Sequence, residues 1–247
     1  MDRWQKKVAV VTGASSGIGA ACCRYLLARD MIVVGLARRQ EVMVAEVQAQ
    51  LTEDQQARFH GLRCDITKEE EILENFAWIE SNLGGIDVLV NNAGIVMYGS
   101  NLLEPNNGDA LRSVIDTNVM GVAYCTREAF LSMQRRCVDG HIIIINSTGG
   151  HTVPTIPNVS TNLYTPSKYA LTAMTEVLRQ ELLIEKTRIK VTSISPGLVD
   201  TPFFPENLTK DICMLHPEDI ADAVVYCLQT PLHVQIHELT ISAMMKY

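Results

Sequence analysis

An apolar run that ends in a glycine-rich turn restricts the possible folds of this chain more than any other stretch. Val8-Ala9-Val10-Val11 contains no polar residue, a pattern typical of a strand buried on both faces of a parallel sheet. The run continues into Thr12-Gly13-Ala14-Ser15-Ser16-Gly17-Ile18-Gly19, and a helical stretch over 20–29 follows. Glycines in such a turn let the backbone approach a pyrophosphate, whose charge is stabilised at the N-terminus of the helix. An ordinary tight turn is the alternative, because the spacing differs from G-x-G-x-x-G. The strand before the turn and the helix after it favour dinucleotide binding.

The same alternation of strand and helix continues to the end of the chain. Further strands are predicted from apolar runs at 31–37, 59–64, 86–90, 142–145, 189–194 and 236–241. Further helices are predicted at 41–51, 67–82, 110–117, 122–136, 164–184 and 217–229. This order predicts an α/β Rossmann fold, a doubly wound parallel sheet of about seven strands with helices on both faces. The length of 247 residues fits a single domain over 1–247, with a substrate lid within 198–216.

Charge and cysteine usage exclude several classes of protein. The net charge is −7 and there is no basic stripe, so we expect no nucleic-acid partner. The seven cysteines are scattered and form no Cys-x-x-Cys, which argues against a disulfide framework or a metal site. The polar start, Met1 to Lys7, does not resemble a signal peptide, and no apolar run approaches ~18 residues. We therefore expect a cytoplasmic protein without a stable membrane anchor.

The residues after the second predicted strand indicate which dinucleotide is bound. Enzymes that use NAD commonly place an acidic residue there to hold the ribose 2′-hydroxyl. This chain has Ala37-Arg38-Arg39 instead. A guanidinium matches a 2′-phosphate in charge and in bidentate geometry. The pattern predicts NADP, with Arg38 as a phosphate ligand and Arg39 as a second candidate; the alternative is that both arginines only begin a solvated helix.

Tyr164 and Lys168 are four residues apart, which puts both side chains on one face of the predicted helix. A lysine beside a phenol favours the phenolate and lowers a pKa that is normally ~10. Such a phenol can exchange a proton with a substrate oxygen near neutral pH. Ser147, just after an apolar strand, can offer a hydroxyl to the same oxygen. The alternative is that these residues are ordinary surface neighbours.

Taken together, these motifs resemble the short-chain dehydrogenase/reductase family over essentially the full length of the chain. The resemblance is carried by the turn Thr12–Gly19, Asn91-Asn92-Ala93-Gly94, Asn118 ahead of Gly121, Ser147, Tyr164-x-x-x-Lys168 and Pro196-Gly197. It implies that Asn118, Ser147, Tyr164 and Lys168 form a catalytic tetrad. In it Tyr164 is the general acid/base, Lys168 lowers its pKa and binds the nicotinamide ribose, and Ser147 orients the substrate oxygen. Asn118 either relays protons through a water and Lys168, or bonds backbone at a helix kink, or does both.

The resemblance also implies a full set of cofactor ligands. These are Gly13, Ser15, Ser16, Gly17, Ile18, Gly19, Arg38, Arg39, Asp65, Ile66, Asn91, Ala93, Gly94, Tyr164, Lys168, Pro196, Gly197, Val199 and Thr201. Seventeen positions separate Ser147 from Tyr164, a few more than is usual in the family. The longer loop affects the shape of the pocket and leaves the chemistry unchanged.

Apolar residues dominate the positions expected near the substrate, so a lipophilic alcohol or carbonyl compound fits better than a sugar or a phosphate ester. Candidate substrate contacts are Val96, His151, Val153, Phe203 and Phe204. Met1–Trp4 and the stretch Ser147–His151 are similar to the subgroup of insect NADP-dependent farnesol dehydrogenases and vertebrate dehydrogenase/reductase member 11. This similarity implies oxidation of farnesol to farnesal; reduction of carbonyl compounds or ketosteroids is the alternative, and a non-catalytic dinucleotide-binding regulator is the remote one. Family resemblance also implies a homodimer or homotetramer, formed through the helices near 122–136 and 164–184.

Overall fold

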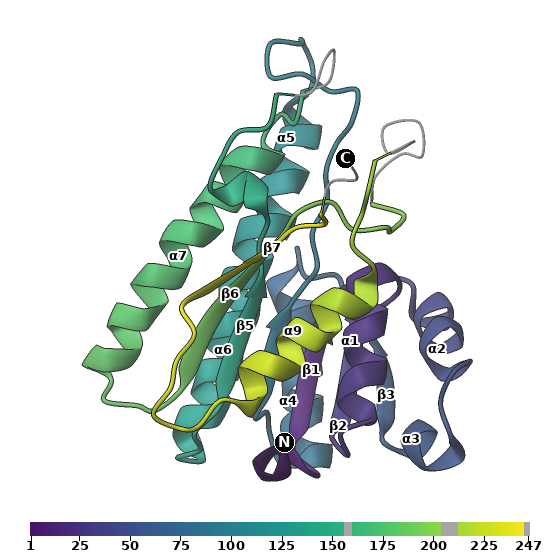
Figure 1. Cartoon of the computed structure of the whole chain (residues 1–247), viewed down its shortest axis with the longest axis vertical. Coiled ribbons are helices and arrows are strands. Elements are labelled where there is room, and N and C mark those ends of the chain that lie inside the picture. Colours follow the sequence, from purple (N-terminus) through teal and green to yellow (C-terminus); the bar gives the residue numbers. More distant parts are fainter. Residues whose placement is uncertain (156–159, 204–211, 245–247) are drawn as a thin grey trace.

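The computed structural model describes residues 1–155, 160–203 and 212–244, and it has a parallel sheet at its centre. Seven strands lie in the order β3-β2-β1-β4-β5-β6-β7 (Figure 1). Their bounds are β1 Val8–Thr12, β2 Ile32–Ala37, β3 Phe59–Arg63, β4 Val88–Asn91, β5 His141–Ile145, β6 Lys190–Pro196 and β7 Glu238–Ile241. The predicted doubly wound sheet is confirmed. Because the strand order reverses between β1 and β4, the carboxyl ends of these two strands flank a crevice.

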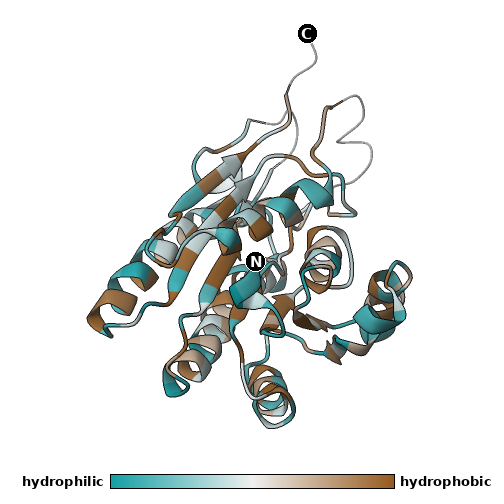
Figure 2. Ribbon diagram, turned by 60° about the horizontal axis from the view of Figure 1, so that its bottom comes forward, coloured by the Kyte–Doolittle hydropathy of each residue, from teal (hydrophilic) through white to brown (hydrophobic). Residues whose placement is uncertain are grey.

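Helices cover both faces of this sheet (Figures 1 and 2). The helices α1 (Gly17–Leu27), α2 (Gln40–Gln48) and α9 (Pro217–Gln229) pack into one hydrophobic core. On the other face, α4 (Glu69–Leu83), α6 (Gly121–Arg135) and α7 (Tyr164–Ile184) pack into a second core. The other α-helices of the described residues are the short α3 (Glu53–Ala57) and α5 (Gly108–Ile115), which precedes α6.

Strand β1 shows why the first apolar run has no polar face. Ala9 and Val11 point into the core under α1 and α9, whereas Val8 and Val10 point into the core under α4 and α6. Each of these four side chains is buried. A polar residue at any of them would lose its hydration without gaining a partner, so the sequence has to be apolar at every position.

Two helix boundaries differ from the sequence prediction. The helix predicted over 41–51 ends at Gln48, and Thr52 starts the separate α3 by accepting a hydrogen bond from the amide of Gln55 at 3.3 Å. Thr67 does not cap the next helix, because Asp65 Oδ1 accepts both its amide and its hydroxyl, at 3.1 and 2.8 Å. That helix, α4, therefore begins at Glu69.

The segment between α5 and α6 also departs from the prediction of a helix over 110–117. Helix α5 ends at Ile115, and one π-helical turn, η2 (Asp116–Met120), joins it to α6. Such wide turns are often found at functional positions. This one carries Asn118, which is 1% exposed.

No helix within the described ranges combines the length and the apolar character that crossing a bilayer requires. Within the same ranges, no group of three or more histidine, cysteine, aspartate or glutamate side chains is arranged to hold a metal ion.

Candidate active site

A cleft of about 340 Å³ lies at the carboxyl edge of the sheet. The sequence prediction and the cleft share most of their residues: Gly13, Ser15, Ser16, Gly17, Ile18, Arg38, Arg39, Asp65, Ile66, Ala93, Gly94, Ser147, Tyr164, Lys168, Pro196, Gly197, Val199, Thr201 and Phe203. The cleft also includes residues that the prediction missed: Leu36, Ala37, Cys64, Asn92, Ile95, Thr117, Ile145, Asn146 and Pro202. Most of the missed residues are neighbours of motif residues at the ends of strands, which is the signal that would have found them.

Glycines shape the floor of the cleft where β1 turns into α1. Gly13 and Gly17 have φ angles of +67° and +53°, a region that favours glycine. A Cβ on Gly13 would lie 2.8 Å from the Cα of Ala93, and one on Gly17 would lie 2.8 Å from the side chain of Thr201. The turn therefore forms a narrow cradle next to a helix N-terminus, which fits a pyrophosphate.

Gly19 does not line this cradle but makes it possible. A Cβ at Gly19 would lie 2.3 Å from the carbonyl oxygen of Gly13. The amide of the Asn92 side chain fills the remaining space and donates to the carbonyls of Thr12 and Gly13 at 2.9 and 3.2 Å. The Thr12 hydroxyl accepts the backbone amides of Asn92 and Ala93, both at 3.0 Å. The turn after β1 and the turn after β4 are thus locked together.

Asn91, also predicted as a cofactor ligand, is 2% exposed and lies behind the cleft. Its side chain donates to the hydroxyl of Thr126 on α6 at 2.9 Å. This contact fixes the end of β4 against the helix layer.

Arg38 and Arg39 are exposed at the end of β2, and both line the cleft. No described residue forms an ion pair or a hydrogen bond with either guanidinium. Both positive charges are therefore available to an anion at this part of the cleft. The carboxylate of Asp65, which lines the cleft nearby, accepts from Thr67.

Tyr164, Ser147 and Lys168 all line the cleft. Ser147 is hydrogen-bonded to the Tyr164 phenol, and its oxygen also accepts the amide of Gly149 at 3.0 Å. Accepting from Gly149 leaves the hydrogen of the Ser147 hydroxyl free, so that hydroxyl can donate to the phenol oxygen. The Lys168 ammonium lies 5.8 Å from the centre of the Tyr164 ring and donates to the carbonyl of Ile145 at 2.9 Å.

Burial changes the proton affinities of both groups. It lowers the pKa of the buried Lys168 ammonium to about 8. Burial also raises the pKa of the Tyr164 phenol, and the hydrogen bond with Ser147 acts in the opposite direction. The net direction for Tyr164 differs from the lowering that the spacing alone predicted, because the sequence does not reveal how strongly the phenol is desolvated.

Asn118 makes the backbone contacts that one of the two sequence interpretations predicted. Its Oδ1 accepts the amide of Ile95 at 2.8 Å, and its Nδ2 donates to the carbonyl of Ile95 at 2.9 Å. Nδ2 also contacts Ser167 Oγ at 3.0 Å, and that hydroxyl donates to the carbonyl of Tyr164 at 2.6 Å. Asn118 therefore ties the wall of the cleft at Ile95 to the first turn of α7.

The structure places one of the predicted substrate contacts in the lining of the cleft and three outside it. Phe203 lines the cleft and its ring centre lies 5.6 Å from that of Tyr164. Val96, His151 and Val153 are outside the lining, and Val153 is 69% exposed. Phe204 lies outside the described residues. His151 turns away from the cleft and contacts β6 and β7.

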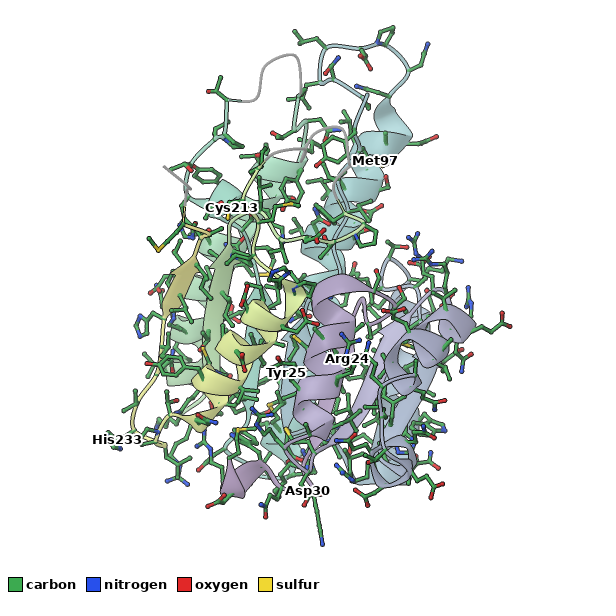
Figure 3. The ribbon with its side chains drawn as sticks, turned by 45° about the vertical axis from the view of Figure 1, so that its right-hand side comes forward. Arg24, Tyr25, Asp30, Met97, Cys213 and His233 are labelled. Atoms are coloured by element: carbon green, nitrogen blue, oxygen red, sulfur yellow. The ribbon has the colours of Figure 1, made fainter. Side chains whose placement is uncertain are left out.

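The loop that follows β4 closes over the start of α7. Asn162 donates its side-chain amide to the carbonyls of Met97 and Ser100, at 3.0 and 2.9 Å. Met97 is labelled in Figure 3. The half-buried Tyr98 belongs to this loop; burial, and then the neighbouring Tyr164, raise the pKa of its phenol. Tyr98 and Phe203 thus place two further aromatic rings near Tyr164.

A cradle for a pyrophosphate, free guanidiniums and a buried Tyr-Lys pair in one cleft define a dinucleotide-dependent oxidoreductase. The family profile described as short chain dehydrogenase matches residues 7–211. This chain belongs to the short-chain dehydrogenase/reductase family, whose members use a nicotinamide cofactor to act on small molecules.

Relatives and solved structures agree with this membership. Farnesol dehydrogenase of Aedes aegypti is 53% identical over 242 residues, which cover 98% of this chain and 97% of the relative. Dehydrogenase/reductase SDR family member 11 of Homo sapiens is 42% identical over 254 residues, covering 97% and 95%. The closed form of serine dehydrogenase complexed with NADP⁺ superposes with a TM-score of 0.83 at 30% identity, covering 95% of this chain and 94% of that chain.

Proposed function

We propose that this chain is an NADP-dependent oxidoreductase that interconverts a lipophilic alcohol and its aldehyde or ketone, with farnesol and farnesal as the leading pair. The observation that carries this proposal is the position of Tyr164, Ser147 and Lys168 in the same cleft as the glycine cradle and Arg38. When bound, the nicotinamide supplies the hydride chemistry. The protein supplies binding, orientation and a path for the proton.

Each residue of the site has a role that follows from its contacts. Tyr164 exchanges a proton with the substrate oxygen, and Ser147 donates a hydrogen bond where negative charge develops on oxygen. Lys168 keeps a positive charge beside the phenol and is anchored by the carbonyl of Ile145. Asn118 holds the wall at Ile95 and the first turn of α7 in register. The residues in the cleft at 13, 15–18, 38–39, 65–66, 93–94, 196–197, 199 and 201 hold the cofactor.

Replacing Arg38 with alanine is expected to weaken NADPH binding by roughly 10- to 100-fold, the usual range for a charge-assisted hydrogen bond to phosphate. The dissociation constant of NADH is expected to change less than about threefold, because NADH lacks the 2′-phosphate and cannot form that bond. Fluorescence titration of both cofactors measures the two dissociation constants. Arg39→Ala decides whether the second guanidinium also contributes. Arg112→Ala, an exposed arginine paired with Asp109, is the control. Equal weakening of NADPH and NADH by Arg38→Ala would refute the assignment.

Aromatic and apolar side chains around Tyr164 support a lipophilic substrate. Phe203, Ile95 and Pro202 line the cleft there, and Tyr98 faces the same phenol. These apolar groups exclude water from an isoprenoid chain and offer few hydrogen-bond partners to the several hydroxyls of a sugar. The 53% identity to the mosquito farnesol dehydrogenase supports farnesol within this class.

A substrate panel tests the proposed reaction. We expect turnover of farnesol with NADP⁺ and little turnover of a short polar alcohol, because binding of the apolar chain positions the hydroxyl. The absorbance of NADPH, followed at fixed enzyme concentration, measures the rates of alcohol oxidation and of carbonyl reduction. Efficient reduction of ketosteroids or diketones without oxidation of farnesol would instead favour a carbonyl reductase. No turnover with any alcohol or carbonyl compound would favour a non-catalytic regulator.

We also propose a homodimer or homotetramer in the cytoplasm. Val177, Leu183 and Ile184 on α7 are 51%, 76% and 75% exposed, which leaves apolar surface for a second copy on that helix. Light scattering of the purified protein tests the assembly: a monomer at micromolar concentration would contradict it. Imaging of a tagged chain tests the location.

A further inference from the structure

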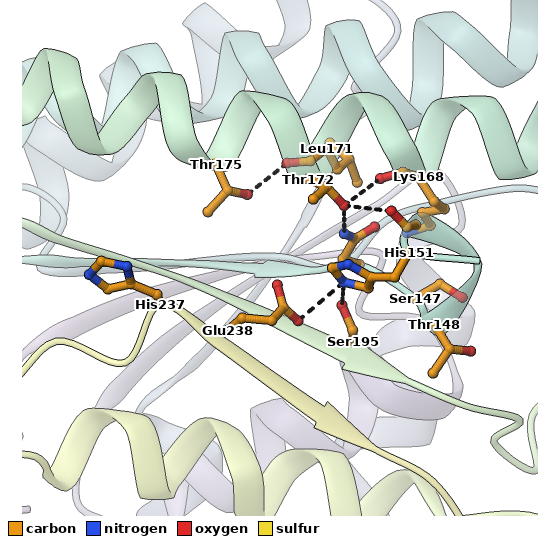
Figure 4. A network of polar contacts seen from close by, with 12 residues as sticks. Ser147, Thr148, His151, Lys168, Leu171, Thr172, Thr175, Ser195, His237 and Glu238 are labelled. Atoms are coloured by element: carbon orange, nitrogen blue, oxygen red, sulfur yellow. Dashed lines mark hydrogen bonds and ion pairs between the residues drawn. The ribbon is translucent and has the colours of Figure 1, made fainter.

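His151 follows the loop that carries Ser147, but its side chain is directed at the sheet (Figure 4). Its Nε2 lies 3.0 Å from the hydroxyl of Ser195 on β6 and 3.5 Å from Oε1 of Glu238 on β7. Ser195 is fully buried, whereas the side chains of His151 and Glu238 are about one-third exposed, at 33% and 31%. One imidazole nitrogen thus bridges two neighbouring strands.

We propose that His151 is a positioning residue: with Ser195 and Glu238 it fixes the Ser147 loop against the end of β6, and so sets where the Ser147 hydroxyl stands. This inference rests on the proposed function, because it assigns Ser147 to the proton-transfer site.

The loop between Ser147 and His151 is tight enough to transmit a displacement. It forms the 3₁₀ turn η3 (Thr148–Gly150), in which the carbonyl of Ser147 accepts the amide of Gly150 at 2.8 Å. The carbonyl of Thr148 accepts the amide of His151 at 3.0 Å, and Ser147 Oγ accepts the amide of Gly149 at 3.0 Å. With these three bonds in place, His151 cannot shift far without moving Ser147.

Helix α7 holds the other side of the same loop. Thr172 accepts the side-chain amide of Asn146 at 2.9 Å and donates its hydroxyl to the carbonyl of Gly150 at 2.9 Å. A Cβ on Gly150 would lie 2.7 Å from the carbonyl oxygen of Lys168, so the loop is pressed against the helix. The loop is therefore held between α7, which carries Tyr164 and Lys168, and β6.

The contact with β6 also reaches the cofactor side of the cleft. Ser195 directly precedes Pro196 and Gly197, which both line the cleft. A histidine that binds Ser195 therefore couples the position of the Ser147 hydroxyl to that of the segment predicted beside the nicotinamide. A direct substrate contact is the competing role for His151. The direction of Nε2, away from the lining residues, favours positioning.

Two substitutions at position 151 separate these roles. Glutamine places an amide nitrogen near the position of Nε2 and can donate to both Ser195 and Glu238, whereas asparagine is too short to reach them. His151→Asn is expected to lower kcat by roughly 10- to 100-fold with KM within about threefold of wild type, because misplacement of a reacting group lowers the rate of the chemical step. His151→Gln is expected to restore kcat to within about threefold. Ser195→Ala is expected to lower kcat like His151→Asn, and the double variant no further.

Hydrogen exchange of the peptide over 147–152 gives a readout that needs no turnover. Exchange is expected to accelerate in His151→Asn and to stay at the wild-type rate in His151→Gln and in the control Thr155→Ala, at an exposed residue outside this loop. A raised KM with unchanged kcat and exchange in His151→Asn would overturn the proposal in favour of substrate contact. Unchanged kcat and exchange in both His151→Asn and Ser195→Ala would overturn it outright. Should the wild-type chain turn over no alcohol or carbonyl compound, the proposed function has failed; should the wild type be active and Tyr164→Phe inactive while His151→Asn is fully active, only the positioning role has failed.

Discussion

Replacing Tyr164 with phenylalanine is expected to lower kcat by roughly 10²- to 10⁴-fold, the range over which general acid/base groups act. The substitution removes one oxygen and leaves the ring, whose centre lies 5.6 Å from that of the Phe203 ring. This contact and the packing of the first turn of α7 therefore stay in place. The dissociation constant of NADPH is expected to change less than about threefold, because the cradle and the guanidiniums are untouched. Steady-state kinetics and a fluorescence titration measure the two quantities.

Tyr169 is the matched control for that substitution. It lies on the same helix five residues further on and is 41% exposed. Tyr169→Phe also removes one phenolic oxygen, and we expect kcat to stay within about twofold of wild type because surface changes rarely reach the site. If Tyr164→Phe retains kcat within tenfold, the phenol does not carry the proton, and Ser147 becomes the candidate.

The sequence predicts the sheet and the cleft well because both depend on short-range patterns. An all-apolar β1 requires burial on two faces, and the turn that follows needs positive φ angles at 13 and 17, which glycine permits. The four-residue spacing of Tyr164 and Lys168 brings both into one cleft as soon as α7 forms. These are local rules that the chain satisfies residue by residue.

What the sequence does not predict depends on contacts between distant segments. The carboxylate of Asp65 removes Thr67 from its expected role as a helix cap, and a π-turn directs Asn118 toward Ile95. His151 was expected near the substrate and lies instead against β6, because Ser195 and Glu238 come from segments more than 40 residues later. The direction of the Tyr164 pKa likewise depends on packing that only the folded chain has.

A buried histidine at the opposite edge of the sheet is expected to make the protein sensitive to acid. His141 is 1% exposed, and its Nε2 lies 2.9 Å from the hydroxyl of Thr192. That hydroxyl donates its hydrogen to the carbonyl of Ile236 at 2.8 Å, so Nε2 carries a proton and Nδ1 does not. Nδ1 is buried and has no partner among the described residues. Burial, and then the positive charges of Lys190 and Arg3, lower the pKa of His141 to about 3.

Above the ordinary histidine pKa of ~6.5, His141 is neutral in the folded and unfolded chain and does not affect the pH dependence of stability. Below that pH, His141 binds a proton in the unfolded chain, whereas in the folded chain it stays neutral until the pH falls to about 3. The free energy of unfolding therefore falls as the pH drops from 6.5 to 3. Through this one group, the free energy of unfolding at pH 4.5 is expected to be about 3 kcal/mol lower than at pH 7.5.

His141→Gln isolates this contribution, because glutamine can donate to Thr192 and does not titrate. Between pH 7.5 and 4.5, we expect the free energy of unfolding to fall by about 3 kcal/mol less in the variant than in wild type. Packing changes lower the free energy of unfolding of the variant at both pH values. Urea unfolding at fixed protein concentration measures the free energies of unfolding of both proteins at both pH values. His233→Gln, at an exposed histidine (Figure 3), should leave the difference between the two pH values as in wild type. An equal loss in His141→Gln and wild type would mean that acid acts through groups other than His141.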